Sequence, residues 1–195
     1  ISEVYDIMKH GLQMSNVEMK ATFEAWNQAE LGSFLTEITA DILGVPDDLE
    51  TGALVDAILD KAKQKGTGKW TSQNAMDLGV PIPTVDAAVR MREISSFKSM
   101  RVEAAKLYTL PMAERADLST DELKAALYTS FIVTYAQGLH QLSEASKEYN
   151  YDLNLEVIAK IWRGGCIIRA KFLEEIRKAY SFNKSLQHLL LNEQI

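Results

Sequence analysis

The sequence is poor in the residues that favour covalent cross-links and tight turns. Among 195 residues it has one cysteine, Cys166, which cannot form an internal disulfide and therefore predicts a reducing, cytoplasmic location. Its ten glycines and four prolines fall below the usual combined share of about 12%, which disfavours a turn-dense all-β architecture. No stretch approaches the roughly 18 apolar residues of a membrane span, so we expect no membrane partner.

The sequence also lacks an excess of positive charge. It carries 21 Lys and Arg against 27 Asp and Glu, a net charge of −6, so no global field attracts a polyanion and nucleic acid is not expected as a partner. An anionic ligand must instead be held by a local group of basic side chains. The three histidines, His10, His140 and His188, are scattered and share no ligand spacing with Cys166, so we expect no metal site.

Helical signals dominate the rest of the chain. Ser15 with Glu18, and Ser119 with Glu122, have the spacing of capping boxes, and the second predicts a helix that runs to about Tyr149. Asn154 is positioned to cap a helix over Leu155–Trp162. No convincing strand alternation and no fixed repeat are present, so the pattern predicts one all-α domain, a helical bundle.

Further helices follow from apolar periodicity. Between Ala125 and Leu142 no residue is charged, which predicts a long central helix enclosed by protein on all sides. Shorter helices are expected over Ala53–Lys63, Ser72–Leu78 and Cys166–Tyr180, and the last of these places Cys166 in an inert core. The pair Gly164-Gly165 suggests a tight helix crossing.

The run from Lys65 to Thr71 has the composition of an oxyanion site. Gly66 and Gly68 allow close backbone approach to a ligand, Thr67 adds a hydroxyl, and Lys65 and Lys69 add positive charge. It is not a Walker loop, because lysine stands at position 63, and not a dinucleotide turn, because threonine stands at position 71. A glycine-rich connector with solvated lysines explains the composition equally well.

Two arginines follow on the next predicted helix. Arg90 and Arg92 are two residues apart and therefore point in different directions, so only one of them can join Lys65 and Thr67 around a phosphate. The alternative is that both lie on a solvated helix face. Trp70, beside the glycine-rich run, is expected to act as a packing anchor rather than a stacking platform.

Several separated motifs, in order and spacing, resemble one known family. The chain closely resembles the helical domain of the 6-phosphogluconate dehydrogenase family from about Ile1 to Leu191. The segments that carry this resemblance are Lys65-Gly66-Thr67-Gly68-Lys69-Trp70-Thr71, Leu78-Gly79-Val80-Pro81, Arg92-Glu93-Ile94-Ser95-Ser96-Phe97-Lys98 and Ile161-Trp162-Arg163-Gly164-Gly165-Cys166-Ile167-Ile168-Arg169.

The resemblance implies a reaction and a set of ligands. The family converts 6-phosphogluconate to ribulose 5-phosphate and CO2 by NADP-dependent oxidative decarboxylation, a step of the pentose phosphate pathway and of gluconate utilisation. It implies that Lys65, Thr67 and Arg92 bind the substrate phosphate, supported by Gly66 and Gly68, and that the protein is a homodimer. The resemblance thus selects Arg92 over Arg90.

The resemblance also implies that residues 1–195 are a helical substrate-binding and dimerisation domain within a longer polypeptide. The nucleotide-binding domain and the catalytic acid and base are expected upstream of Ile1, and a tail that reaches the neighbouring subunit beyond Ile195, so the fragment alone should not turn over. Two alternatives stay open: a related β-hydroxyacid dehydrogenase that acts on an unphosphorylated acid, and a non-catalytic helical module that mediates association.

Overall fold

The computed structural model describes residues 1–49, 52–108 and 116–195. The regular structure of these residues is helical, and their β-type pairing is limited to the isolated bridges Ser33–Ala170 and Pro46–Ala53. The predicted all-α class is confirmed. No helix among the described residues is long and apolar enough to cross a membrane.

The N-terminal helices form the first of two apolar cores. Helix α1 (Ser2–Asp6) continues into a π-helical turn, η1 (Ile7–Gly11), and α2 (Asn16–Gln28) packs against α3 (Phe34–Leu43). The start of the long helix α8 (Thr120–Glu148) completes this group. The buried side chains of this core are Val4, Met8, Leu12, Met19, Phe23, Trp26, Leu31, Ala40, Leu43, Leu123 and Leu127.

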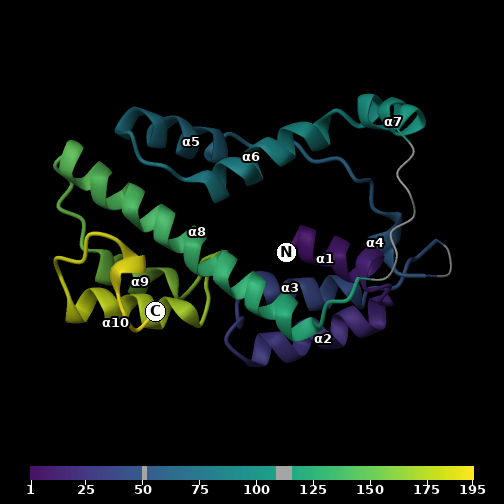
Figure 1. Ribbon diagram of the computed structural model, residues 1–195, viewed down its shortest axis with the longest axis horizontal. Coiled ribbons are helices and arrows are strands. Elements are labelled where there is room, and N and C mark those ends of the chain that lie inside the picture. The colour runs from purple at the N-terminus through teal and green to yellow at the C-terminus, as the bar shows by residue number, and fades with distance from the viewer. Residues whose placement is uncertain (50–51, 109–115) are drawn as a thin grey trace.

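The second core lies along the other half of α8. Helices α9 (Leu155–Trp162) and α10 (Phe172–Phe182) pack against each other, and a short 3-10 turn, η2 (Leu189–Leu191), packs on α8. Figure 1 shows α8 crossing the molecule diagonally, with α2 and α3 at one end and α9 and α10 beneath the rest. Helix α8 is therefore the shared central element that the charge-free stretch predicts.

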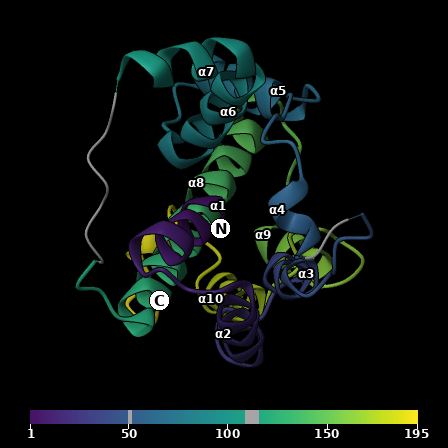
Figure 2. The same ribbon diagram turned by 90° about the vertical axis from the view of Figure 1, so that its right-hand side faces the viewer.

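A separate helical layer lies on the opposite side of α8. It consists of α5 (Thr67–Leu78), α6 (Pro83–Ser96) and α7 (Lys98–Leu107), reached from the short α4 (Leu54–Ala57) by an extended segment (Figures 1 and 2). Its own buried apolar core is small and contains Ala75, Val80 and Ile82.

Two buried glutamines of α8 fasten this layer to the rest of the molecule. Gln137 Oε1 accepts hydrogen bonds from the amide and the hydroxyl of Thr84 on α6, at 3.0 and 2.7 Å. Gln141 Nε2 donates to the Thr71 carbonyl and to Asn74 Oδ1 on α5, both at 3.0 Å. Each of these two helices is thus held by one amide side chain.

The predicted enclosure of α8 is correct for only part of its surface. Ala125, Ala126, Thr129, Ser130 and Thr134 are exposed. The three hydroxyl groups donate back to carbonyls one turn earlier in α8, at 2.7–2.9 Å, so this face offers small side chains whose polar atoms are already satisfied.

The helix starts predicted from capping side chains are confirmed. Ser15 and Ser119 each form a complete capping box with the glutamate three residues later, and Asn154 Oδ1 accepts from the Val157 amide at 3.1 Å. Helix α8 ends at Glu148, one residue before the predicted end, and α9 has the predicted bounds.

Two predicted helices are shorter than expected. The helix expected over Ala53–Lys63 is limited to the four residues of α4, and residues 58–65 are not helical. Helix α10 begins at Phe172, because the chain turns at Gly165, whose φ is +66°. A Cβ at Gly164 or Gly165 would meet nothing within 4 Å, so the expected tight helix crossing is absent at these residues.

Candidate anion-binding site

The N-terminus of α5 lies within the glycine-rich run that the sequence singles out. The sequence predicts a helix from Ser72, but α5 already begins at Thr67, five residues earlier and inside this run. Its N-cap is Gly66, which has no side chain to bond the first-turn amides, and the first turn contains Lys69 and no acidic residue. Helix N-termini with free amide groups attract anions.

Glycine is required at positions 66 and 68 of this run for different structural reasons. Gly66 adopts φ +107° and ψ −38°, a conformation that residues with a Cβ rarely adopt. A Cβ on Gly68 would lie 2.9 Å from Val89 Cγ2, so α5 and α6 approach closely at this point. Close approach at Gly68 is therefore explained by helix packing, whereas the sequence suggested approach to a ligand.

Arg92 lies beside the segment that carries Lys65. Its guanidinium donates a hydrogen bond to the Lys63 carbonyl, two residues before Lys65. Arg90 instead pairs with Glu93 on its own helix, at 3.0 Å. The side chains of Lys65, Thr67 and Arg92 are all exposed. We call Lys65, Gly66, Thr67, Gly68 and Arg92 the α5–α6 corner.

The non-helical segment that leads into the corner is bonded to α6 and α7. The Ala62 amide donates to Ser95 Oγ at 3.0 Å, and Gln64 Nε2 donates to Glu93 Oε1 at 2.9 Å. At its start, Asp60 pairs with Lys98 and, at 3.0 Å, with Arg101.

The charges at the start of this segment persist over a wide pH range. The hydrogen bonds from Lys98 and then from Arg101 lower the pKa of the Asp60 carboxyl to about 2. The ion pairs at Asp60 are therefore present at any pH near neutrality, and they attach the start of the segment to α7.

Trp70 is not the packing anchor that the sequence suggests. Its side chain is 65% exposed, although one edge of the indole lies 3.6–3.8 Å from the position a Cβ on Gly66 would occupy. The ring therefore lies at the surface beside the corner and contributes little to the core.

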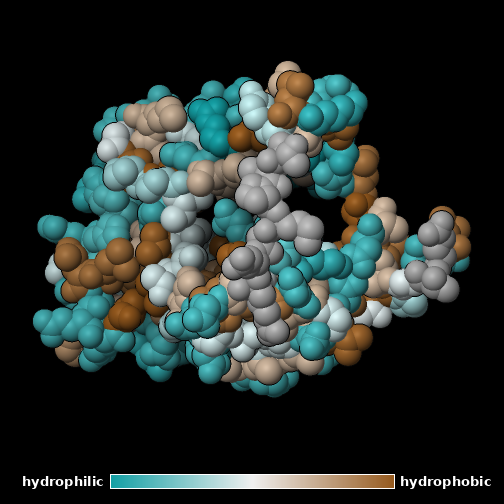
Figure 3. All heavy atoms as spheres, turned by 45° about the vertical axis from the view of Figure 1, so that its right-hand side comes forward, coloured by the Kyte–Doolittle hydropathy of each residue, from teal (hydrophilic) through white to brown (hydrophobic). Residues whose placement is uncertain are grey.

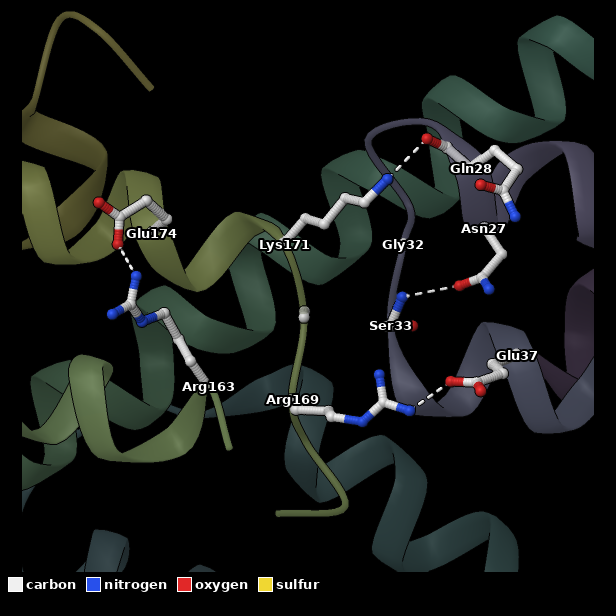
Figure 4. Close-up of a pocket in the computed structure, with 10 residues that line it drawn as sticks. Asn27, Gln28, Gly32, Ser33, Glu37, Arg163, Arg169, Lys171 and Glu174 are labelled. Atoms are coloured by element: carbon white, nitrogen blue, oxygen red, sulfur yellow. Dashed lines mark hydrogen bonds and ion pairs between the residues drawn. The ribbon is translucent and has the colours of Figure 1, made fainter. Parts of the chain in front are cut away.

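A hollow lies elsewhere, between the α2–α3 turn and residues 163–174 (Figure 4). This groove has a volume of about 540 Å³. It is lined by Asn27, Gln28, Gly32, Ser33, Glu37, Arg163, Arg169, Ala170, Lys171 and Glu174.

The cationic groups of this groove already have protein partners. Arg163 pairs with Glu174, and Arg169 pairs with Glu37. Lys171 Nζ donates to the Gln28 carbonyl at 2.6 Å, as the dashed lines in Figure 4 show. The bonds of Arg169 and Lys171 join this segment to α3 and to the end of α2, and the Arg163–Glu174 pair lies within residues 163–174. The groove's cations are therefore used within the fold, whereas the side chains of Lys65 and Arg92 are exposed.

The structure brings together two histidines that sequence spacing does not connect. The rings of His140 on α8 and His188 before η2 lie 5.1 Å apart, edge to face, and His188 Nδ1 accepts from the Leu190 amide at 3.2 Å. Among the described residues no group of His, Cys, Asp and Glu has the arrangement of a metal site.

Cys166, expected in the core, is half-buried in the turn before α10.

These features define a class of protein: an all-α domain in which a layer fastened to a long central helix presents a basic corner to solvent. The family model described as 6-phosphogluconate dehydrogenase, C-terminal domain, matches residues 1–195. The chain belongs to this family.

Relatives support the same assignment. The chain is 48% identical to 6-phosphogluconate dehydrogenase, decarboxylating, of Lactococcus lactis subsp. cremoris, over 99% of the chain and 42% of the relative. It is 50% identical to the Citrobacter amalonaticus protein of the same name, over 98% of the chain and 43% of that relative. The chain thus spans about two fifths of the length of these relatives.

A solved structure has the same fold. The 6-phosphogluconate dehydrogenase of Plasmodium falciparum, determined without ligand and with NADP+ or 6-phosphogluconate, matches with a TM-score of 0.94 and 45% identity. The match covers 99% of this chain and 42% of the Plasmodium chain. Both the fold and the family are therefore established over almost every residue of the chain.

Proposed function

We propose that residues 1–195 are the substrate-binding and dimerisation domain of an enzyme that converts 6-phosphogluconate to ribulose 5-phosphate and CO2 with NADP. Family membership and the names of the relatives support this reaction. The observation that carries the proposal is the bond between Arg92 and the Lys63 carbonyl, because it brings the guanidinium of Arg92 to the segment that ends at Lys65, next to the start of α5 at Thr67. Arg90, the other arginine of α6, pairs with Glu93 instead. In this proposal the domain works in the cytoplasm.

Each member of the α5–α6 corner has a distinct role toward the phosphate. Arg92 uses its remaining guanidinium donors for two phosphate oxygens while one donor stays on Lys63. Lys65 contributes the positive charge of an exposed side chain, and Thr67 a hydroxyl at the positive end of α5. A charge-assisted hydrogen bond stabilises a complex by roughly 1.5–3 kcal/mol, so three such groups select a phosphorylated sugar acid over an unphosphorylated one.

The corner does not fit a dinucleotide. The turn lacks a third glycine at position 71, and the space that Gly68 leaves open is taken by Val89. We therefore assign NADP, together with the catalytic acid and base, to protein outside residues 1–195, and the corner to the phosphate of the substrate alone.

The test compares variants of the complete gene product by NADPH formation with 6-phosphogluconate. Arg92→Ala and Lys65→Ala should each raise KM about tenfold or more. Lys147→Ala is the matched control, because it removes one positive charge from an exposed lysine on α8 that pairs with Glu144; its KM should stay within about twofold of the unmodified enzyme.

An unchanged KM in Arg92→Ala would refute the phosphate role. An enzyme for an unphosphorylated acid would tolerate both substitutions and ignore 6-phosphogluconate. A non-catalytic association module would form no NADPH at all.

We also propose that the domain forms a homodimer. Large apolar side chains are exposed on α7 and at its junction with α6: Phe97 between the two helices at 55%, and Met100 and Leu107 on α7 at 66% and 77%. Figure 3 shows hydrophobic side chains at the surface of this layer. The exposed small-residue face of α8 adds a surface without charge. Sedimentation at micromolar concentration should give twice the mass of the chain, and a monomer there would contradict the proposal.

A further inference from the structure

A chain of polar contacts on α6 leads from Arg90, which has no place in the phosphate site, to the residue before Lys65. Arg90 Nη1 donates to Glu93 Oε2 at 3.0 Å, and Glu93 Oε1 accepts from Gln64 Nε2 at 2.9 Å. Gln64 directly precedes Lys65 in the chain. Glu93 is thus bonded on one oxygen to its own helix and on the other to the segment that enters the corner.

Two adjacent residues of α6 form hydrogen bonds with two adjacent residues of this segment. Arg92 bonds the backbone of Lys63 and Glu93 bonds the side chain of Gln64. Because residues 58–65 have no helical hydrogen bonds, their path depends on such contacts. These two bonds to α6 therefore fix the backbone position from which the Lys65 side chain extends.

The position of Glu93 creates an electrostatic problem for a phosphate site. Its carboxylate is next in sequence to Arg92 and only about one third exposed, so its charge opposes a phosphate dianion at the corner. Arg90 compensates that charge and keeps one oxygen turned toward itself.

We infer that Glu93 and Arg90 are positioning residues of the phosphate site: Glu93 aligns Lys65 through Gln64, and Arg90 orients and neutralises Glu93. The inference rests on the proposed function, since it concerns the same phosphate. Neither residue touches the substrate. Glu93 acts through Gln64 on the neighbouring Lys65, and Arg90 acts through Glu93.

The roles of hydrogen bond and charge can be separated by four variants of the complete gene product: Glu93→Ala, Glu93→Gln, Arg90→Ala and the double variant Arg90→Ala/Glu93→Gln. The measurements are KM and kcat for 6-phosphogluconate, the inhibition constant of inorganic phosphate, and the melting temperature. Arg92→Ala serves as the reference for the phosphate site itself.

Glu93→Ala should raise KM and the phosphate inhibition constant in parallel, about 3- to 10-fold, with little change in kcat. Glu93→Gln keeps an acceptor for Gln64 and should stay near the unmodified enzyme. Arg90→Ala leaves the carboxylate uncompensated and should raise KM, whereas the double variant has no charge left to compensate and should recover. Glu103→Gln/Lys106→Ala breaks an exposed ion pair of the same i, i+3 spacing on α7 and should change neither constant.

A lower melting temperature with unchanged KM in Glu93→Ala would make Glu93 a structural residue and overturn the inference. So would a Glu93→Gln variant as impaired as Glu93→Ala, or a double variant that fails to recover. If Arg92→Ala raises KM and Glu93→Ala does not, the inference alone fails. If Arg92→Ala leaves KM unchanged, the proposed function fails first.

Discussion

Replacing Gln137 by leucine should loosen the helical layer that carries the α5–α6 corner. The side chain is 9% exposed and accepts two hydrogen bonds from Thr84, on the first turn of α6. Leucine has a similar volume and no acceptor, so the change removes both bonds without opening a large cavity.

The expected cost follows from the bonds that are lost. A typical hydrogen bond contributes about 0.5–1.5 kcal/mol, and the Thr84 amide lies at a helix N-terminus, where it has no partner within the helix. Two such bonds give a loss of about 1–3 kcal/mol in the free energy of unfolding. For a chain of this length, about 2 kcal/mol corresponds to a melting temperature about 4–8 °C lower.

Calorimetry and amide exchange test this prediction together. The Gln137→Leu variant should melt at a lower temperature, and the Thr84 amide should lose protection before amides in the cores along α8. Gln73→Leu makes the same chemical change at an exposed position of α5 and should have little effect. A Gln137→Leu protein that melts within about 1 °C of the unmodified chain, with Thr84 still protected, would refute the reasoning.

Two further predictions concern backbone strain and pH. Gly66→Ala should lower the free energy of unfolding, measured by urea titration, by about 1–3 kcal/mol, because position 66 has a positive φ. Gly138→Ala is the control: it lies in mid-helix with open space around its Cβ position and should stabilise the chain slightly. A Gly66→Ala chain as stable as the unmodified one would contradict the prediction. Burial, and then the neighbouring His140, lower the pKa of His188 from its ordinary value of 6.5, so its uncharged form stabilises the fold above that value and this contribution is lost as pH falls through the lowered pKa. The protection factor of the Leu190 amide, which donates to His188, should therefore fall as the pH drops below about 6.5, and a protection factor that stays constant in NMR-detected exchange would exclude the mechanism.

Helix starts that carry a capping side chain could be predicted from the sequence because their signals are local. The capping boxes at Ser15 and Ser119 need only a glutamate three residues later, and Asn154 bonds an amide three residues away. Each signal therefore sits within one turn of the chain and does not depend on the rest of the fold.

Segments whose hydrogen-bond partners are distant could not be predicted. Residues 58–65 have enough apolar and basic character for a helix, but their polar groups bond to α6, as the Ala62–Ser95 contact shows. The turn before α10 behaves in the same way, because the Lys171 amide donates to the Gly32 carbonyl and the Phe34 amide to the Arg169 carbonyl. In both segments tertiary bonds replace helical ones, and no periodicity reveals that exchange.

The candidate site lies between these cases. Residue types alone point to an oxyanion site around Lys65 and Thr67, but they leave Arg90 and Arg92 equal, because helical spacing says that they diverge without saying where either one goes. The Lys63 carbonyl and Glu93 make the difference, and both contacts depend on how α6 lies against a non-helical segment. That the phosphate binds there stays a prediction.

The way the layer is attached has a consequence for substrate binding. Apolar contact is non-directional and would let two helices slide, whereas an amide hydrogen bond fixes both distance and angle. The layer has a small apolar core of its own, and Gln137 and Gln141 bond α6 and α5 separately to one helix. The separation of Thr67 on α5 from Arg92 on α6 is therefore set at α8 as well as by the close approach at Gly68. A substitution at either glutamine should consequently weaken phosphate binding as well as stability, although neither side chain is part of the corner.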